Sequence, residues 1–338
     1  MRFIIDAMGG DNAPGQIVEG TMLALEKLGQ EDEIVFVGRE KEIQSAMKKA
    51  KAKDSRISIV NADEVIENNE HPVKAVRRKK ESSIVVGLEL VRDGKGDAFL
   101  SAGSTGALLA GGLFILGRCR GISRPALATV YPVIGKQPSL MIDVGANAEC
   151  RPRNLLEFGV MGSLYMQEVV GRPDPTVGLV NNGTEEGKGT TLTKEAYRLL
   201  DESGLNFIGN IEARDLQEGI VDVIVTDGFT GNCLIKLTEG LGLMVLRELK
   251  DRFTTNMKTK LSALMMKDQL MDIKKQFNYS EYGGAPILGL KKPLLKMHGS
   301  SDALAVSQTI LKAVPYVRED VVGKIEHSLE EMEEEEAR

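Results

Sequence analysis

The sequence contains no tryptophan, and aromatic residues make up only 4% of its 338 residues. It therefore lacks the aromatic side chains on which single-stranded nucleic acids usually stack. Acidic residues outnumber basic ones by 49 to 43, which gives a formal net charge of −6. Because nucleic-acid-binding domains usually carry a basic surface, we expect no nucleic-acid partner.

Cysteine and histidine are also scarce, with three residues of each type. The cysteines lie far apart in the sequence, and their odd number argues against a disulfide framework. Neither residue type forms a cluster with the spacing of a metal site. We therefore expect reduced thiols in a cytoplasmic protein, with no metal and no cofactor. The residues concerned are Cys119, Cys150, Cys233, His71, His298 and His327.

Long apolar runs are missing as well. The first five residues, which include Arg2, hold too short an apolar stretch for a signal peptide. Residues 98–117 carry no charge over about the length of a membrane span. However, the polar turn at residues 101–106 divides that segment into a strand and a short buried helix. We expect no transmembrane segment.

What the sequence has in abundance is glycine, with 36 residues, in turns that follow short apolar runs and precede amphipathic helices. This alternation of strands and helices predicts an α/β fold with a doubly wound, mainly parallel sheet and helices on both faces. The expected strands are residues 3–6, 34–37, 57–60, 97–100, 127–131, 140–144, 176–180, 207–209 and 221–226.

The pattern changes in the C-terminal third. Residues 228–277 are helical in character, with no convincing strand, and a glycine- and proline-rich connector follows at residues 282–289. A last helical region begins at about residue 300. We predict one αβα domain over residues 1–325, a helical projection at 228–277 and a solvated acidic tail at 326–338.

Six turns combine glycine with small polar residues, and five of them directly follow expected strands. Each turn alone could serve only to cap the next helix. Together, at the carboxyl ends of the strands, their backbone N–H groups predict a shared site for phosphate or carboxylate. The turns are residues 6–14, 101–106, 143–147, 181–189, 226–232 and 298–302.

Several familiar sites are excluded by spacing. The turn at 183–190 is one residue short of a P-loop and has Gly189 where Ser or Thr should hold magnesium. The first turn lacks the dinucleotide pattern G-x-G-x-x-G, and no G-x-S-x-G elbow is present. The remaining Lys, Asn, Asp, Ser and Thr side chains suit anion binding and oxyanion stabilisation without a covalent enzyme intermediate.

In their order along residues 1–315, the motifs at 6–11, 101–106, 143–147, 183–189, 212–215, 225–232, 282–284 and 298–302 closely resemble the bacterial acyl-[acyl-carrier-protein]:phosphate acyltransferases of phospholipid synthesis. Two positions depart from that family's pattern: Asn12, where His is usual, and Ser104, where Asn is common. A histidine base at position 12 is therefore doubtful here.

The resemblance implies a Rossmann-like αβα fold, a homodimer, and peripheral attachment to the inner face of the cytoplasmic membrane. It implies that inorganic phosphate attacks a fatty acyl thioester of acyl carrier protein. The product, an acyl phosphate, would pass to a membrane-bound acyltransferase that consumes it.

Within this resemblance, we expect Lys188 to be the main cation at the reacting centre and Asn232 to donate an amide hydrogen bond. Asp227 and His298 would orient these groups, although His298 alone could be a loop hydrogen-bonding residue. Asp6 and Asp143 could equally act only as helix caps. The expected phosphate and substrate cradle is Asp6, Gly9, Gly10, Asn12, Ser104, Thr105, Asp143, Asn147, Thr184 and Ser300.

Two basic segments suggest partners. Lys74, Arg77 and Arg78 share one helical face that suits an acidic carrier protein, or else is simply solvated. Residues 252–277 hold six basic and two acidic residues among large apolar ones. This combination favours contact with an anionic membrane, with a buried dimer or core helix as the alternative. The expected membrane contacts are Leu261, Leu264, Met265, Lys258, Lys260 and Lys267.

Three other functions stay open at this point. A short-chain phosphotransacylase that uses coenzyme A is the nearest. A decarboxylating hydroxy-acid dehydrogenase is disfavoured by the missing dinucleotide pattern. A non-catalytic membrane scaffold would make no acyl phosphate.

Overall fold

The structure, a computed structural model, describes residues 1–133, 135–276 and 283–336. Its centre is a single sheet of eleven strands. In chain order the strands are β1 (Arg2–Asp6), β2 (Glu33–Gly38), β3 (Ile57–Asn61), β4 (Ala98–Ser101), β5 (Ala126–Tyr131), β6 (Ser139–Ile142), β7 (Val177–Asn181), β8 (Phe207–Glu212), β9 (Val223–Val225), β10 (Ala285–Leu288) and β11 (Leu294–Lys296).

The strands lie in the order β3-β2-β1-β4-β11-β10-β5-β6-β9-β7-β8. Among the strands of the described residues, only the pairs β10–β11, β10–β5 and β5–β6 are antiparallel, so two parallel halves meet at an antiparallel centre. The predicted fold class is therefore confirmed. Because parallel strands end at the same edge, the turns after β1, β4 and β11 lie together in one half, and those after β6 and β9 lie together in the other.

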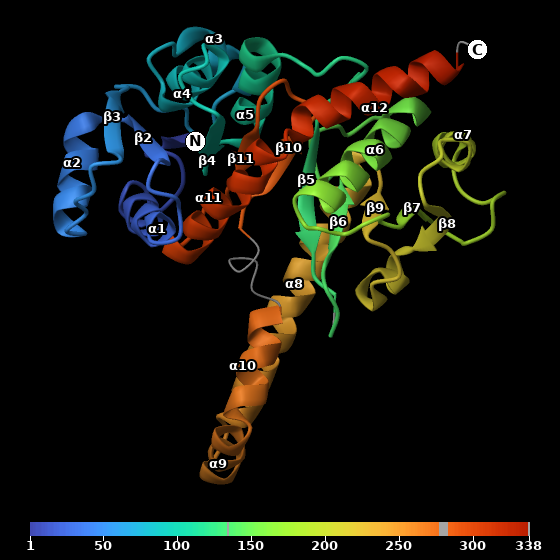
Figure 1. Ribbon diagram of the computed structural model, residues 1–338. Helices are drawn as coiled ribbons and strands as arrows, with labels where there is room; N and C mark the ends of the chain where they lie inside the picture. The colour runs from blue at the N-terminus through green and yellow to red at the C-terminus, as the bar shows by residue number, and fades with distance from the viewer. Residues whose placement is uncertain (134, 277–282, 337–338) are drawn as a thin grey trace.

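Helices cover both faces of this sheet (Figure 1). Helices α1, α2, α6, α7, α11 and α12 pack on one face, and α3, α4, α5 and the start of α8 pack on the other. Their bounds are α1 (Gly15–Leu25), α2 (Glu40–Lys49), α3 (Pro72–Arg78), α4 (Ser83–Arg92), α5 (Thr105–Gly111), α6 (Pro152–Glu168), α7 (Thr191–Asp201), α8 (Gly228–Phe253), α9 (Met257–Met265), α10 (Lys267–Gln276), α11 (Ala303–Arg318) and α12 (Val321–Glu336).

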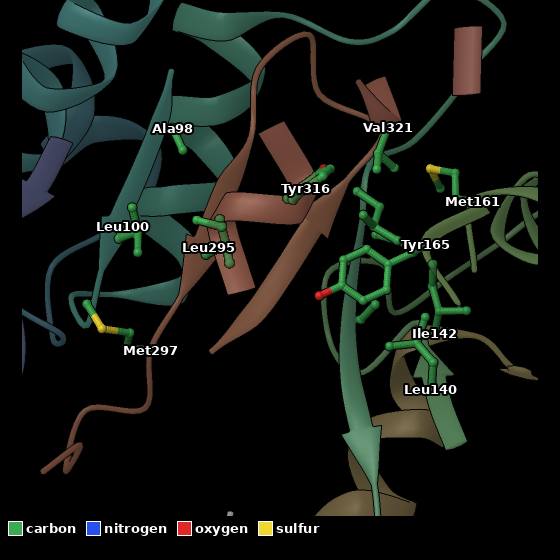
Figure 2. Packing of buried hydrophobic residues seen from close by; sticks show 14 of the residues in the cluster. Ala98, Leu100, Leu140, Ile142, Met161, Tyr165, Leu295, Met297, Tyr316 and Val321 are labelled. Atoms are coloured by element: carbon green, nitrogen blue, oxygen red, sulfur yellow. The ribbon is translucent and has the colours of Figure 1, made fainter. Parts of the chain in front are cut away.

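The core joins the two halves of the sheet (Figure 2). The rings of Tyr165 on α6 and Tyr316 on α11 meet edge to face, with centroids 5.8 Å apart. Leu100 and Leu295 from the first half and Ile142 from the second are fully buried in the same cluster. The turns at the strand ends are therefore supported by one continuous hydrophobic core.

Two of the eleven strands were not expected. The glycine and proline content of residues 282–289 predicts a connector, yet Ala285–Leu288 forms β10 in the middle of the sheet. Proline is rare in central strands, which is why the sequence misleads here. The other, β11, has only three residues and shows no measurable alternation.

The uncharged segment at residues 98–117 folds as expected, into β4, α5 and a π-helical turn at Gly112–Leu116. In the described ranges, no helix is both long enough and apolar enough to cross a bilayer.

The predicted helical projection corresponds to α8, α9 and α10, which extend away from the sheet (Figure 1). We call residues 247–276 the arm. Three of its apolar side chains are largely exposed: Leu261 retains 61% of its accessible surface, Leu264 67% and Met265 80%. The last predicted residue of the projection, Phe277, lies outside the described ranges.

The segment predicted as a solvated acidic tail is helical as far as residue 336. Residues 326–336 continue α12, and the buried side chain of Leu329 packs into the main core. An ion pair between Lys324 and Glu168, 2.6 Å long, further ties α12 to α6. The glutamates dominate the composition of this segment, but its sparse apolar residues decide its structure.

Candidate active site

Asp6, at the end of β1, holds the first turn together. Its Oδ1 accepts hydrogen bonds from the N–H groups of Met8 (3.0 Å) and Gly9 (3.1 Å), and Ser101 Oγ donates to Oδ2 at 2.6 Å. Burial raises the pKa of this carboxyl group, and the hydrogen bonds partly offset that effect. Asp6 therefore stabilises the turn from its buried side and is not itself exposed to a ligand.

The first turn packs closely against its neighbours. Gly10 has a φ of +97°, and a Cβ there would lie 2.9 Å from the carbonyl oxygen of Gly299. A Cβ on Gly9 would lie 2.6 Å from the backbone nitrogen of Gly103. Asn12 donates from Nδ2 to Ser300 O at 3.4 Å. The turns after β1, β4 and β11 thus form one packed unit.

Asp143 stabilises the turn after β6 in the second half of the sheet, as Asp6 stabilises the turn after β1 in the first half. Its carboxylate accepts from the N–H groups of Leu127, Gly145, Ala146 and Asn147 at 2.7–3.1 Å. Asn147 Nδ2 also donates to it, at 2.9 Å, and to Pro125 O at the same distance. Burial raises the pKa of Asp143. Both residues were expected in the cradle, but the structure gives them a buried supporting place beneath it.

Helix α8 begins directly beside that turn. Asp227 caps the helix, accepting from Thr230 N at 2.9 Å and from Thr230 Oγ1 at 2.7 Å. Asn232 donates from Nδ2 to Val144 O at 3.0 Å. Gly145 has a φ of +135°, and a Cβ there would lie 2.8 Å from Asn232 Nδ2. The amide of Asn232 is therefore fixed at the edge of the second half.

A cavity of about 580 Å³ lies between the two halves. Its polar end brings together four predicted residues, Thr105, Asn232, His298 and Ser300. The rest of its wall is mostly apolar and follows α8 through Ile235, Leu243 and Leu246. One space thus combines hydrogen-bond donors from both halves with a long apolar surface.

The ring of His298 is oriented by its own turn. Its Nδ1 accepts the backbone N–H of Ser300 at 3.2 Å and lies 2.8 Å from Ser300 Oγ. Because a backbone N–H can only donate, Nδ1 carries no proton in this arrangement. The ring N–H that can donate to a bound group is then the one on Nε2.

Lys296, at the end of β11, also lines the cavity and was not among the predicted site residues. Burial lowers the pKa of this lysine to about 8, although the charges of Asp6 and Asp11 act in the opposite direction. Its ammonium group donates to Met297 O and lies 3.5 Å from Ala102 O. The sequence offers one sign of this role, a lysine two residues before His298. It does not reveal β11, the strand that places the lysine in the cavity.

Three further predicted residues do not line the cavity. Lys188 and Thr184 are exposed on the loop after β7, and Ser104 caps α5. The backbone of that loop is held by Asn181 Nδ2, which donates to Lys188 O at 3.1 Å, and by Asn210 Nδ2, which donates to Glu185 O at 3.0 Å. The loop is anchored, and its lysine faces solvent.

Comparison with known proteins agrees with this architecture. The family model described as fatty acid synthesis protein matches residues 1–324. The phosphate acyltransferase of Alkaliphilus oremlandii is 49% identical over 96% of both chains. That of Clostridium acetobutylicum is 48% identical over 98% of this chain and 100% of its own. This chain belongs to the phosphate acyltransferase family. The predicted family and enzyme class, an acyltransferase, are thereby confirmed.

Solved structures extend the likeness of the fold. A phosphotransacetylase from Streptococcus pyogenes superposes with a TM-score of 0.66 at 17% identity, covering 94% of each chain. A branched-chain phosphotransacylase from Enterococcus faecalis gives 0.59 at 16% identity, covering 94% of this chain and 99% of its own. At such low identity the likeness shows only that these phosphotransacylases and this phosphate acyltransferase family member share a fold.

Proposed function

We propose that the protein transfers a fatty acyl group from acyl carrier protein to inorganic phosphate, which yields acyl phosphate and a free carrier thiol. The observation that carries this proposal is the cavity between the two halves of the sheet. Its polar end suits a small anion and a thioester carbonyl, and its apolar wall along α8 suits an alkyl chain.

The reaction needs little acid–base catalysis from the protein. A phosphate oxygen attacks the thioester carbon, the new C–O bond forms, and the C–S bond breaks to release a thiolate. Phosphate is partly a dianion near pH 7, and a free thiol has a reference pKa of about 8.5, so neither a strong base nor a strong acid is needed. Alignment and oxyanion stabilisation remain, and Asn232 Nδ2 and His298 Nε2 are the donors we assign to them.

The apolar wall favours a long acyl chain. From Asn232 to Leu246, α8 rises by about 21 Å. Ile235, Leu243 and Leu246 line the cavity along this distance. An acetyl group would leave most of that surface without contact. This supports a long-chain donor over the short-chain phosphotransacylase that the sequence had left open.

The basic face of α3 is our proposed docking surface for the acidic carrier protein. Lys74, Arg77 and Arg78 are exposed, and the guanidinium of Arg77 lies 5.2 Å from the centre of the Phe114 ring. Helix α3 packs tightly on α5. The two helices are so close that a Cβ on Gly106 would lie only 2.5 Å from Pro72 Cγ. A carrier bound to α3 would therefore sit beside the cavity.

A second copy of the chain is the proposed partner of α8. Leu237, Leu241, Met244 and Val245 are 45–60% exposed and recur at the spacing of one helical face. An apolar stripe of this kind is normally covered by another helix. We propose a homodimer in which two α8 helices pair and two arms project from it.

The arm is the proposed membrane contact. Exposed Leu261, Leu264 and Met265 lie among exposed Lys258, Lys260 and Lys267, as expected of a surface that enters an anionic bilayer interface. An acyl phosphate released there avoids exposing its alkyl chain to water, at about 0.8 kcal/mol per methylene. We propose that the protein binds the inner face of the cytoplasmic membrane and delivers its product to a membrane-bound acyltransferase.

Lys188, predicted as the main cation at the reacting centre, remains our proposal for that role, acting from the anchored loop after β7. Its side chain makes no hydrogen bond or ion pair with any described residue, so its charge is available to a ligand.

The test compares donors with the purified wild-type protein. Long-chain acyl carrier protein and the matching acyl-coenzyme A are supplied separately with phosphate, and acyl phosphate is measured. We expect strong preference for the carrier-bound donor. Equal or better use of short-chain acyl-coenzyme A would support the phosphotransacylase alternative, and no acyl phosphate from any donor would support a scaffold.

A further inference from the structure

Lys296 is a half-buried cation whose charge is influenced by Asp6 and Asp11 but which forms an ion pair with neither. In the described ranges it forms no ion pair, and the oxygens of the nearby Asp6 already accept from Met8, Gly9 and Ser101. The ammonium group finds only two backbone carbonyl oxygens, those of Ala102 and Met297. It nevertheless lines the same cavity as Asn232 and His298.

Such a group is costly to fold, because burial removes a charge from water and carbonyl oxygens repay only part of the loss. Its pKa of about 8 reflects that cost. An anion that enters the cavity would restore the missing charge interaction. Of the two proposed reactants, only inorganic phosphate brings a full charge to the reacting centre, whereas the thioester carbonyl is neutral in the ground state.

We propose that Lys296 binds the phosphate substrate and holds it against the turns after β4 and β11. This inference rests on the proposed function and adds the residue that recognises its acceptor. The alternative is that Lys296 only ties β11 to the turn after β4 through the two carbonyl oxygens. The two roles differ in what replacement should do to stability and to the KM for phosphate.

The experiment uses Lys296→Met, which removes charge and donor, and Lys296→Gln, which keeps a neutral donor. Lys292→Met is the matched control, because that lysine is exposed in the loop before the same strand. We expect both Lys296 variants to raise the KM for phosphate by about 10- to 100-fold, the usual effect of losing a hydrogen bond to a charged group. The KM for the acyl donor should stay within about twofold, and the melting temperature should not fall.

Phosphate binding is also measured without any acyl donor, through the rise in melting temperature that phosphate causes. That rise should be present in the wild type and in Lys292→Met, and largely lost in both Lys296 variants. An unchanged KM for phosphate, or full recovery by Lys296→Gln, would overturn the proposal in favour of the tying role.

These outcomes are separable from failure of the proposed function. If the wild type makes no acyl phosphate but its stability still responds to phosphate through Lys296, then the reaction is wrong and the anion site stands. If acyl phosphate forms equally well in all variants, the reaction stands and the anion site is wrong.

Discussion

The strand ends and the arm use the same kinds of side chain in opposite ways. Leu100 and Leu295 in the sheet are completely buried, whereas Leu261 and Leu264 in the arm are more than 60% exposed. Lysine shows a similar contrast, since Lys296 is half-buried and Lys258 is exposed. Burial in the sheet stabilises the fold, but the arm's apolar surface contributes nothing to folding of a single chain. The two regions should therefore carry separable functions, one chemical and one of attachment.

The largest expected effect is that of Asn232→Ala, which should separate turnover from membrane binding. We expect turnover to fall by about 10²–10³-fold, as when an oxyanion donor is removed, while vesicle binding stays normal. Cys233→Ala is the control, because this exposed neighbour on α8 has no assigned role. Initial rates of acyl phosphate formation and a vesicle sedimentation assay measure the two functions. Near-normal rates would remove Asn232 from the mechanism.

Lys188→Ala should lower turnover by about 10²-fold if the loop after β7 delivers a cation to the reaction. Stability should be unchanged, because the side chain is exposed. Lys194→Ala, an exposed lysine on the following helix, serves as the control. Activity within about threefold of the wild type would confine the chemistry to the cavity and exclude Lys188 from it.

Replacing Leu261, Leu264 and Met265 together by serine tests the arm. Binding to anionic vesicles should weaken by at least about tenfold, because three apolar side chains no longer enter the interface. Turnover of soluble carrier-bound donors should persist. The wild type should bind neutral vesicles more weakly than anionic ones, since each nearby lysine adds about 1 kcal/mol only at a negative surface. Aggregated or inactive monomers would instead identify the arm as a buried interface.

The smallest expected effect concerns pH and belongs to the sheet region alone. Burial lowers the pKa of Lys312 to about 8, as it does for Lys296. Between that value and the unfolded value near 10.5, the unfolded chain binds more protons, so the free energy of unfolding rises with pH. From pH 7 to 9 each lysine should add about 1 kcal/mol.

Lys312→Met should remove its share of that rise, as measured by denaturant unfolding at both pH values. Comparing variant with wild type cancels Cys119, whose pKa burial raises to about 12 and whose effect has the opposite sign. An identical pH dependence in the two proteins would show that Lys312 is hydrated in the folded state.

The sequence predicted this fold well wherever strands and helices alternate, because the hydrophobic period reports burial directly. It failed at β10 and β11, where a proline and a length of three residues hide strands that only their neighbours in the sheet can define. The helix at the acidic end of the chain was not predicted for a related reason. The many glutamates outweighed the few apolar residues that pack α12 against the core.

The site was predictable to the extent that turn chemistry is local. Thr105, Asn232, His298 and Ser300 follow from their turns, and all four line one cavity. The position of Lys296 in the cavity was not predictable, because it depends on the pairing of β11 with β4. For Lys188 the reverse holds: its motif is conspicuous, but its loop lies outside the cavity lining.

A crystal structure with a bound, non-hydrolysable analogue of a long-chain acyl phosphate tests the central claim most directly. The account predicts the phosphoryl group at the polar end of the cavity, within hydrogen-bond reach of Lys296 and His298, and the alkyl chain along α8 toward Leu246. An analogue bound outside the cavity, without contact to Lys296 or His298, or with its chain directed away from α8, would contradict it.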